Sequence, residues 1–147
     1  MKRIWTVLGL AAALAVTWSI GPVEDQGKQP KKKELIFVAA DEAKFKEVVP
    51  GVSKAVLWGD HDKGPYGAFT KFAPGYDAGM HTHTSDVWIV VLKGTYRYKD
   101  DVGEKRVGPG DFIRVPGGRK HSSGGDATEG ALFYEESSGK FDLVPAK

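Results

Sequence analysis

The sequence predicts an all-β fold of short antiparallel strands that close into a sandwich or a barrel. Runs of β-branched and aromatic residues recur through most of the chain, and turns that contain Gly or Pro separate them. The 147 residues include 19 Gly and 8 Pro, a composition that favours tight turns over long helices. Closing such a sheet removes the exposed strand edges through which β proteins aggregate.

Eight segments have the composition of strands, and turn residues separate them. They are Leu35–Val38, Ala55–Trp58, Tyr66–Phe72, Val87–Leu92, Thr95–Lys99, Asp111–Val115, Ala131–Tyr134 and Phe141–Val144. One further segment, Asp41–Val48, is expected to form a short helix with Asp41 as its N-cap. The number and length of the strands are typical of a single small β domain.

The chain begins with a segment typical of export signals. Lys2 and Arg3 precede an uncharged, mostly apolar run that extends to Ile20 and contains small residues near its end. We therefore expect a signal peptide at residues 1–20 and a secreted or periplasmic protein; an uncleaved membrane anchor is the alternative. Residues 21–34, GPVEDQGKQPKKKE, are polar without an apolar period, which predicts a linker before a folded domain at 35–147.

The composition excludes several kinds of chemistry. The chain has no Cys, which rules out disulfides, thiolate nucleophiles, iron–sulfur clusters and Cys-ligated zinc. A formal net charge of +2 is too small to indicate nucleic acid as a partner, and membrane contact is expected only through the signal segment. The expected partner is a small molecule, and any metal ion must be bound by nitrogen and oxygen.

Three of the 4 His residues have the spacing of metal ligands. His81 and His83 are two residues apart at the entry to a predicted strand, and the period of 2 places both imidazoles on one face. His121 follows the predicted strand Asp111–Val115 through a tight turn, so it can supply a third nitrogen. His61 lies in a turn-like loop and is interpreted as a surface residue. Three imidazoles suit a first-row divalent metal with open positions.

The histidines lie within two motifs that resemble those of the cupin family. Residues 75–94, GYDAGMHTHTSDVWIVVLKG, are similar to the first cupin motif at Gly75, His81, His83 and Gly94. Residues 110–121, GDFIRVPGGRKH, are similar to the second motif at Gly110, Pro116, Gly118 and His121. The resemblance implies a single cupin domain, a jelly-roll-like antiparallel β-barrel, and at the level of the family a homodimer.

The chain departs from the cupin pattern at two positions. The glutamate ligand of the first motif falls at Val87, and the asparagine that often ends the second motif falls at Gly125. Asp86 is adjacent, but strand alternation directs it away from the histidines. The remaining three-His set resembles the iron centres of thiol dioxygenases and diketone-cleaving dioxygenases, which implies Fe(II), although Zn, Mn or Ni also fits three histidines.

About half of the strand residues of a small barrel face inward. The candidates to line a pocket are Phe69, Phe72, Ile89, Tyr96, Tyr98, Phe133 and Glu135. One of Glu135 and Glu136 must face inward because they are adjacent, and Glu135 is the candidate catalytic residue, as a base or as a partner of the metal ligands. Arg114, Lys71 and Lys120 are candidates to meet an anionic substrate.

Three functions remain open from the sequence. The first is an exported metal-dependent dioxygenase that acts on a small organic substrate. The second is a non-catalytic cupin that binds a metal or another small ligand, and the third is a zinc-dependent hydrolase or isomerase. Oxygen consumption distinguishes the first function from the other two.

Overall fold

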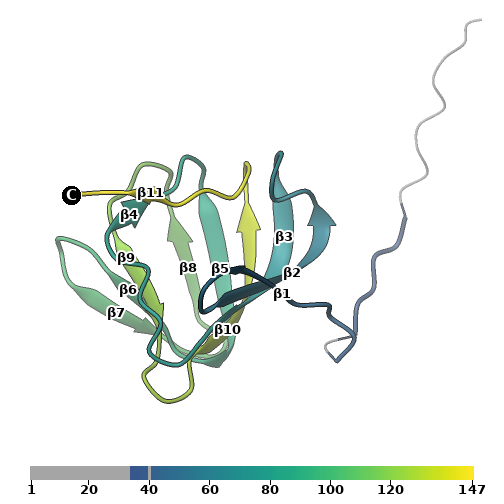
Figure 1. The fold of residues 1–147 in the computed structure, drawn as a ribbon, viewed down its shortest axis with the longest axis horizontal. Coiled ribbons are helices and arrows are strands. Elements are labelled where there is room, and N and C mark those ends of the chain that lie inside the picture. The colour runs from purple at the N-terminus through teal and green to yellow at the C-terminus, as the bar shows by residue number, and fades with distance from the viewer. Residues whose placement is uncertain (1–33, 40) are drawn as a thin grey trace, which may run out of the picture. The chain divides into compact units, whose positions relative to one another are not determined.

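The computed structural model describes residues 34–39 and 41–147 (Figure 1). The predicted signal peptide, and all of the predicted linker except Glu34, lie outside the described residues. Within residues 34–39 and 41–147 the chain forms strands and no helix. This part of the chain therefore contains no helix long and apolar enough to cross a membrane.

The described residues form eleven strands. They are β1 (Lys46–Val49), β2 (Val52–Gly59), β3 (Tyr66–Phe72), β4 (His81–Thr82), β5 (Val87–Gly94), β6 (Tyr96–Lys99), β7 (Glu104–Val107), β8 (Phe112–Val115), β9 (Ser122–Gly125), β10 (Ala131–Ser137) and β11 (Val144–Pro145). All of their pairings are antiparallel. The predicted all-β, jelly-roll-like fold is confirmed.

Two sheets enclose the interior of the domain. The large sheet has the order β1-β2-β3-β10-β5-β8, and a three-stranded sheet has the order β7-β6-β9. Figure 1 shows β6, β7 and β9 on one side of the domain and the strands of the large sheet on the other, with the chain end at β11 crossing between them to pair with β4. This crossing segment places the C-terminal residues over one end of the barrel.

The core follows from the alternation of side chains along the strands. In β5, Val87, Ile89 and Val91 are buried while Trp88 and Val90 are only half-buried. The core cluster also draws residues from β6, β7, β8 and β10, namely Tyr96, Tyr98, Val107, Val115, Ala131 and Phe133. In β10 the same alternation directs Glu135 inward and leaves Glu136 half-buried, as strand geometry requires of two adjacent residues.

Two motif glycines have backbone conformations that other residues rarely adopt. Gly94 has φ 71° where β5 ends, and a Cβ there would lie 2.4 Å from the carbonyl oxygen of Gly130. Gly118 has φ 77° in the turn between β8 and β9. Left-handed backbone is accessible to Gly without a steric cost, so these positions allow the chain to reverse and bring His121 back to the barrel.

The structure corrects three of the predicted elements. Residues 41–48 do not form a helix, because Asp41 and Glu42 form a turn and Lys46–Val49 pairs with β2. Leu35–Val38 forms no strand; it pairs with no strand of residues 41–147, and Leu35 and Phe37 are 94% and 83% exposed. Of the strand expected at Phe141–Val144, only Val144 is extended in a ladder. In each case pairing with a distant strand, or its absence, overrides local propensity.

Candidate metal centre

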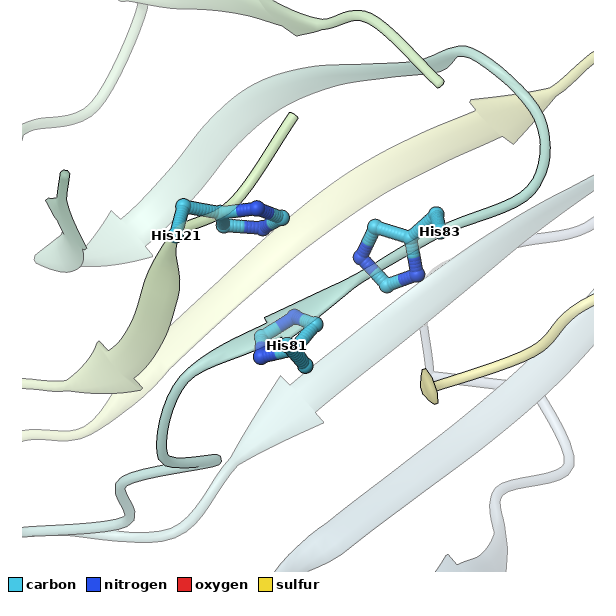
Figure 2. A group of neighbouring side chains, drawn as sticks. All are labelled: His81, His83 and His121. Atoms are coloured by element: carbon cyan, nitrogen blue, oxygen red, sulfur yellow. The ribbon is translucent and has the colours of Figure 1, made fainter. Parts of the chain in front are cut away.

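The three histidines are brought together by one bridge between two segments of the barrel wall. His81 begins β4 and His121 directly precedes β9, and each donates its backbone N–H to the other's carbonyl oxygen, at 2.8 and 3.0 Å. His83 follows β4 and lies on the same face as His81. The ring centroids of His81 lie 4.3 Å from His121 and 4.9 Å from His83. Figure 2 shows the three rings gathered in one place.

Hydrogen bonds to backbone carbonyls fix the tautomer of all three imidazoles. The Nδ1 atoms of His81 and His121 lie 2.8 Å from the oxygen of Gly79 and 2.9 Å from the oxygen of Arg119. The Nδ1 of His83 lies 2.6 Å from the oxygen of Asp142. A carbonyl oxygen only accepts, so each Nδ1 carries a proton, and in the neutral form of each ring the free lone pair is on Nε2. Metal-ligating histidines are oriented in this way.

The two buried histidines are held neutral. His81 and His121 are 0% exposed, and their Nε2 atoms are buried without a hydrogen-bond partner. Burial lowers the pKa of His81, and burial together with the neighbouring imidazoles lowers the pKa of His121 to about 4. Each of these buried, unprotonated Nε2 atoms has a lone pair without a partner among the described residues, and a bound cation would supply one.

The donor set fits a divalent metal ion. Ligand atoms of His81, His83 and His121 all lie within 4.8 Å of one another. Metal–nitrogen bonds are about 2.0–2.1 Å long, so binding of a single ion would draw the three nitrogens slightly closer together. A ligand set of three nitrogens without a thiolate suits zinc, iron, nickel or copper and does not select among these metals.

Neither Val87, which is aligned with the cupin glutamate, nor the adjacent Asp86 adds a ligand. Val87 is buried and lines the cavity next to the histidines. The carboxylate of Asp86 accepts hydrogen bonds from Arg114, at 2.5 Å, and from the backbone N–H of Gly117, at 2.9 Å. The side chain of Asp86 is therefore satisfied on the outside of the barrel, as strand alternation predicts.

His121 has further support from the β6–β7 hairpin. The ring of Tyr98 stacks on His121 with centroids 5.3 Å apart and an angle of 17° between planes. The Tyr98 hydroxyl donates to Asp100 at 2.9 Å, and Arg119 donates to the same carboxylate at 2.6 Å. Arg119 holds the pKa of Asp100 at about 2. Because the Arg119 carbonyl also accepts from His121, this ion pair fixes the segment that orients the ligand.

His83 depends instead on the C-terminal strap, which we define as residues 138–147. The Asp142 carboxylate accepts hydrogen bonds from the backbone N–H and the hydroxyl of Thr84. The strap is also fastened where β11 pairs with β4 and where Ala146 donates its N–H to Met80 at 2.9 Å. The carbonyl that orients His83 is thus held in place by contacts 58–59 residues away in sequence.

His61, interpreted from the sequence as a surface residue, is only partly exposed. The side chain of His61 is 22% exposed, and its ring lies 6.0 Å from Tyr66 and 6.5 Å from Phe141. The carbonyl of His61 accepts the Phe141 N–H at 2.7 Å. The strap packs over this loop and covers part of it, which a local sequence pattern does not reveal.

A mainly apolar cavity of about 40 Å³ adjoins His81 and His83. Five predicted pocket residues line it: Phe72, Ile89, Tyr96, Phe133 and Glu135. Of the other two, Phe69 is half-buried and packs edge-on against Tyr134, and Tyr98 contacts His121. Phe141 and Leu143 of the C-terminal strap also line the cavity. The strap therefore both orients a ligand and limits access to the space beside it.

Glu135 takes part in a buried polar cluster that the sequence reasoning missed. Lys54, on β2, forms an ion pair with Glu135, and the two residues are 3% and 6% exposed. The Tyr66 hydroxyl donates to Glu135 Oε1 at 2.5 Å. Burial opposes ionisation of Glu135, but Lys54 and the hydrogen bonds lower its pKa below the ordinary value. Burial lowers the pKa of Lys54, and the attraction of Glu135 opposes that shift.

The predicted anion-binding candidates lie elsewhere. Arg114 pairs with Asp86, Lys71 lies 3.6 Å from the centroid of the Phe45 ring, and Lys120 donates to the carbonyl oxygen of Lys147. All three are outside the cavity lining. A period of 2 counted from the buried Val52 would have identified Lys54 as inward-facing.

A jelly-roll-like antiparallel barrel with three histidines gathered on its inner wall defines a small cupin. The chain belongs to the family of the ChrR cupin-like domain, whose model matches residues 33–140. No curated protein matches the sequence.

Solved structures share this fold at low sequence identity. The polyketide cyclase RemF from Streptomyces resistomycificus is 18% identical, with a TM-score of 0.64 over 78% of this chain and 87% of that one. KdgF from Halomonas sp. is 20% identical, with a TM-score of 0.59 over 72% and 94%. A chain in the complex of Rhodobacter sphaeroides SigE with the anti-sigma ChrR is 17% identical, with a TM-score of 0.54 over 67% and 50%.

Proposed function

We propose that this cupin is an exported metal-dependent oxygenase, similar to a dioxygenase, that acts on a small organic substrate. The observation that carries the proposal is the set of three clustered imidazoles, each held at Nδ1 by a backbone carbonyl, beside an apolar cavity. Secretion or a periplasmic location, contact with the membrane through the signal segment alone, and a homodimer are parts of the same proposal. The proposal includes a small-molecule substrate and no nucleic-acid partner.

The residues of the site would hold an ion and leave some of its coordination positions free. His81, His83 and His121 would supply nitrogen ligands, and the apolar Val87 occupies the position of an additional carboxylate ligand. Fe(II), the favoured ion, would supply Lewis acidity and the redox chemistry that dioxygen requires, whereas Zn would supply Lewis acidity alone. Because the imidazoles are neutral, they leave the positive charge of the ion available to an anionic substrate.

The protein around the site would bind the substrate and exclude water. Phe133, Ile89 and the strap residue Phe141 present apolar surface to the cavity. Glu135 is buried and ionised, the form that a general base requires, and we propose it as the residue that handles a substrate proton. Its contacts with Lys54 and Tyr66 would hold the carboxylate in one orientation while it does so.

Metal content and oxygen uptake test this function. The purified protein, prepared without chelator, is analysed for metal beside the variant in which His81, His83 and His121 are all changed to Ala. We expect near-stoichiometric iron that the triple variant lacks, and oxygen consumption by the iron form with small enolisable carbonyl compounds. Zinc in the native protein together with activity in anaerobic buffer would replace this proposal with the hydrolase or isomerase.

The size of the cavity favours one competing function, a non-catalytic binding cupin. A water molecule needs about 10–15 Å³ of such volume, so about 40 Å³ accommodates a few waters or a very small ligand. A protein that binds metal in full stoichiometry and consumes no oxygen with any carbonyl compound would fit this second function.

A further inference from the structure

The cavity has polar groups on two sides that come from opposite walls of the barrel. Lys54, Tyr66 and Glu135 lie on β2, β3 and β10 of the large sheet. His81 and His83 lie at β4, which belongs to the small sheet with β11. All five residues line the same cavity. Apolar side chains, among them Val87, Ile89 and Phe133, form much of the remaining lining.

Two of the three hydrogen bonds of the Lys54 ammonium group are long and therefore weak. One of its contacts is the ion pair with Glu135, and the other two, to the Tyr66 hydroxyl and the Thr70 hydroxyl, are 3.4 Å long. An N–H···O bond is normally 2.7–3.2 Å long. The ring of Phe141 covers the ammonium group at 4.3 Å. An oxygen atom of a ligand that enters beneath Phe141 would therefore replace weak bonds with a strong one.

With a divalent ion bound, the charge of the site would favour an anionic ligand. Lys54 and Glu135 compensate one another, and imidazoles that ligate a metal are neutral, so a divalent ion held by the three histidines contributes its two positive charges without a protein counter-charge. In an apolar cavity an uncompensated charge is costly. A negatively charged group of a ligand bound at the ion would reduce this cost, and Lys54 would then be left to recognise a different group.

We propose that the natural ligand is a small organic anion with a second oxygen group, a carbonyl or hydroxyl, and that Lys54 recognises this second group. The anionic end faces the ion held by the histidines, and a short apolar spacer crosses the cavity to Lys54. Glu135 and Tyr66 act as positioning residues, because they hold Lys54 at the large sheet. This inference rests on the proposed metal-dependent function and specifies the substrate class of that function.

Two very small acids that differ only in a terminal hydroxyl group test the inference. The protein is loaded with Co(II), whose visible absorption reports ligand binding at the ion, and is titrated with propanoate and with 3-hydroxypropanoate. We expect the hydroxy acid to bind about tenfold more tightly, the effect of one hydrogen bond to a charged group. In the double variant Lys54→Met/Glu135→Gln the ratio of the two Kd values should fall to about one, with the Kd of propanoate unchanged.

Control variants separate recognition from folding. Glu135→Gln keeps Lys54 and an acceptor oxygen beside it, so it should reduce the preference between the two acids without abolishing it, as expected of a positioning residue. Lys71→Met removes an exposed lysine outside the cavity and should change neither Kd. Equal Kd values in the unaltered protein, no binding of either acid, or a preference that survives in the double variant would overturn the inference. Absence of Co(II) absorption before any acid is added would instead count against the proposed metal-dependent function.

Discussion

The two polar sides of the cavity, one with the histidines and one with Lys54 and Glu135, differ in how far apart in sequence their contacting residues lie. The histidine side is built from short segments, and two of its three ligands are oriented by carbonyls two residues away, those of Gly79 and Arg119. The side with Lys54 and Glu135 joins residues 81 positions apart through the large sheet. Local segments can supply donor atoms at a fixed spacing, whereas a buried ion pair requires the completed fold. The histidine side is thus expected to control metal binding, and the Lys54 side stability and ligand choice.

The largest expected effect is loss of the metal in His121→Ala. Two imidazoles and an enlarged opening replace the three-nitrogen set, so affinity for Zn(II) should fall by roughly 100-fold or more. Competition with a chromophoric chelator measures it. His61→Ala is the matched control, because His61 lies outside the cluster, and it should retain the affinity of the unaltered protein. Equal losses in the two variants would contradict the assignment of His121.

Removing one member of the ion pair should have the largest effect on folding. Lys54→Met leaves the carboxylate of Glu135 buried without its counter-ion, and the free energy of unfolding should fall by roughly 3–5 kcal/mol. Lys54→Met/Glu135→Leu removes both charges and should recover most of the loss. Urea unfolding of the two variants measures the difference. A double variant no more stable than Lys54→Met would show that the pair does not act as a unit.

The same contrast explains what could be predicted from the sequence. The histidines were accessible because His81 and His83 follow strand periodicity and lie between motif glycines, and β3 and β5 were accessible because their apolar runs are continuous. Lys54 was missed because a lysine in a strand is usually solvated, and only its partner on β10 makes its burial tolerable. The helix at 41–48 was wrong since pairing of β1 with β2 is not visible in local propensity.

As the pH falls, protonation linked to His121 should lower the free energy of unfolding before the surface ion pairs are affected. The pKa of His121 is about 4 in the folded chain and about 6.5 when unfolded. Between these values the unfolded state binds more protons, so the metal-free protein should lose stability as pH falls from about 6.5 to 4, by at most about 1.4 kcal/mol per pH unit for this group. Unfolding by urea at several pH values measures the slope, and His121→Gln should show a shallower one. An identical slope in both would exclude His121 as the source.

The smallest effect is expected at His83. It belongs to the histidine side, but its orientation depends on a distant segment, the C-terminal strap. Asp142→Ala keeps the carbonyl that accepts from His83 but removes the bonds to Thr84 that hold it. We expect Zn(II) affinity to fall by roughly three- to tenfold, less than the 10–100-fold typical of losing a direct partner of a ligand. Asp142→Asn retains one acceptor oxygen and should recover part of the affinity. Asp62→Ala, at an exposed loop position, is the control and should bind as the unaltered protein does. Because His81 and His121 take their orientation from their own loops, a loss in Asp142→Ala as large as in His121→Ala would mean that the strap supports the whole cluster rather than one ligand.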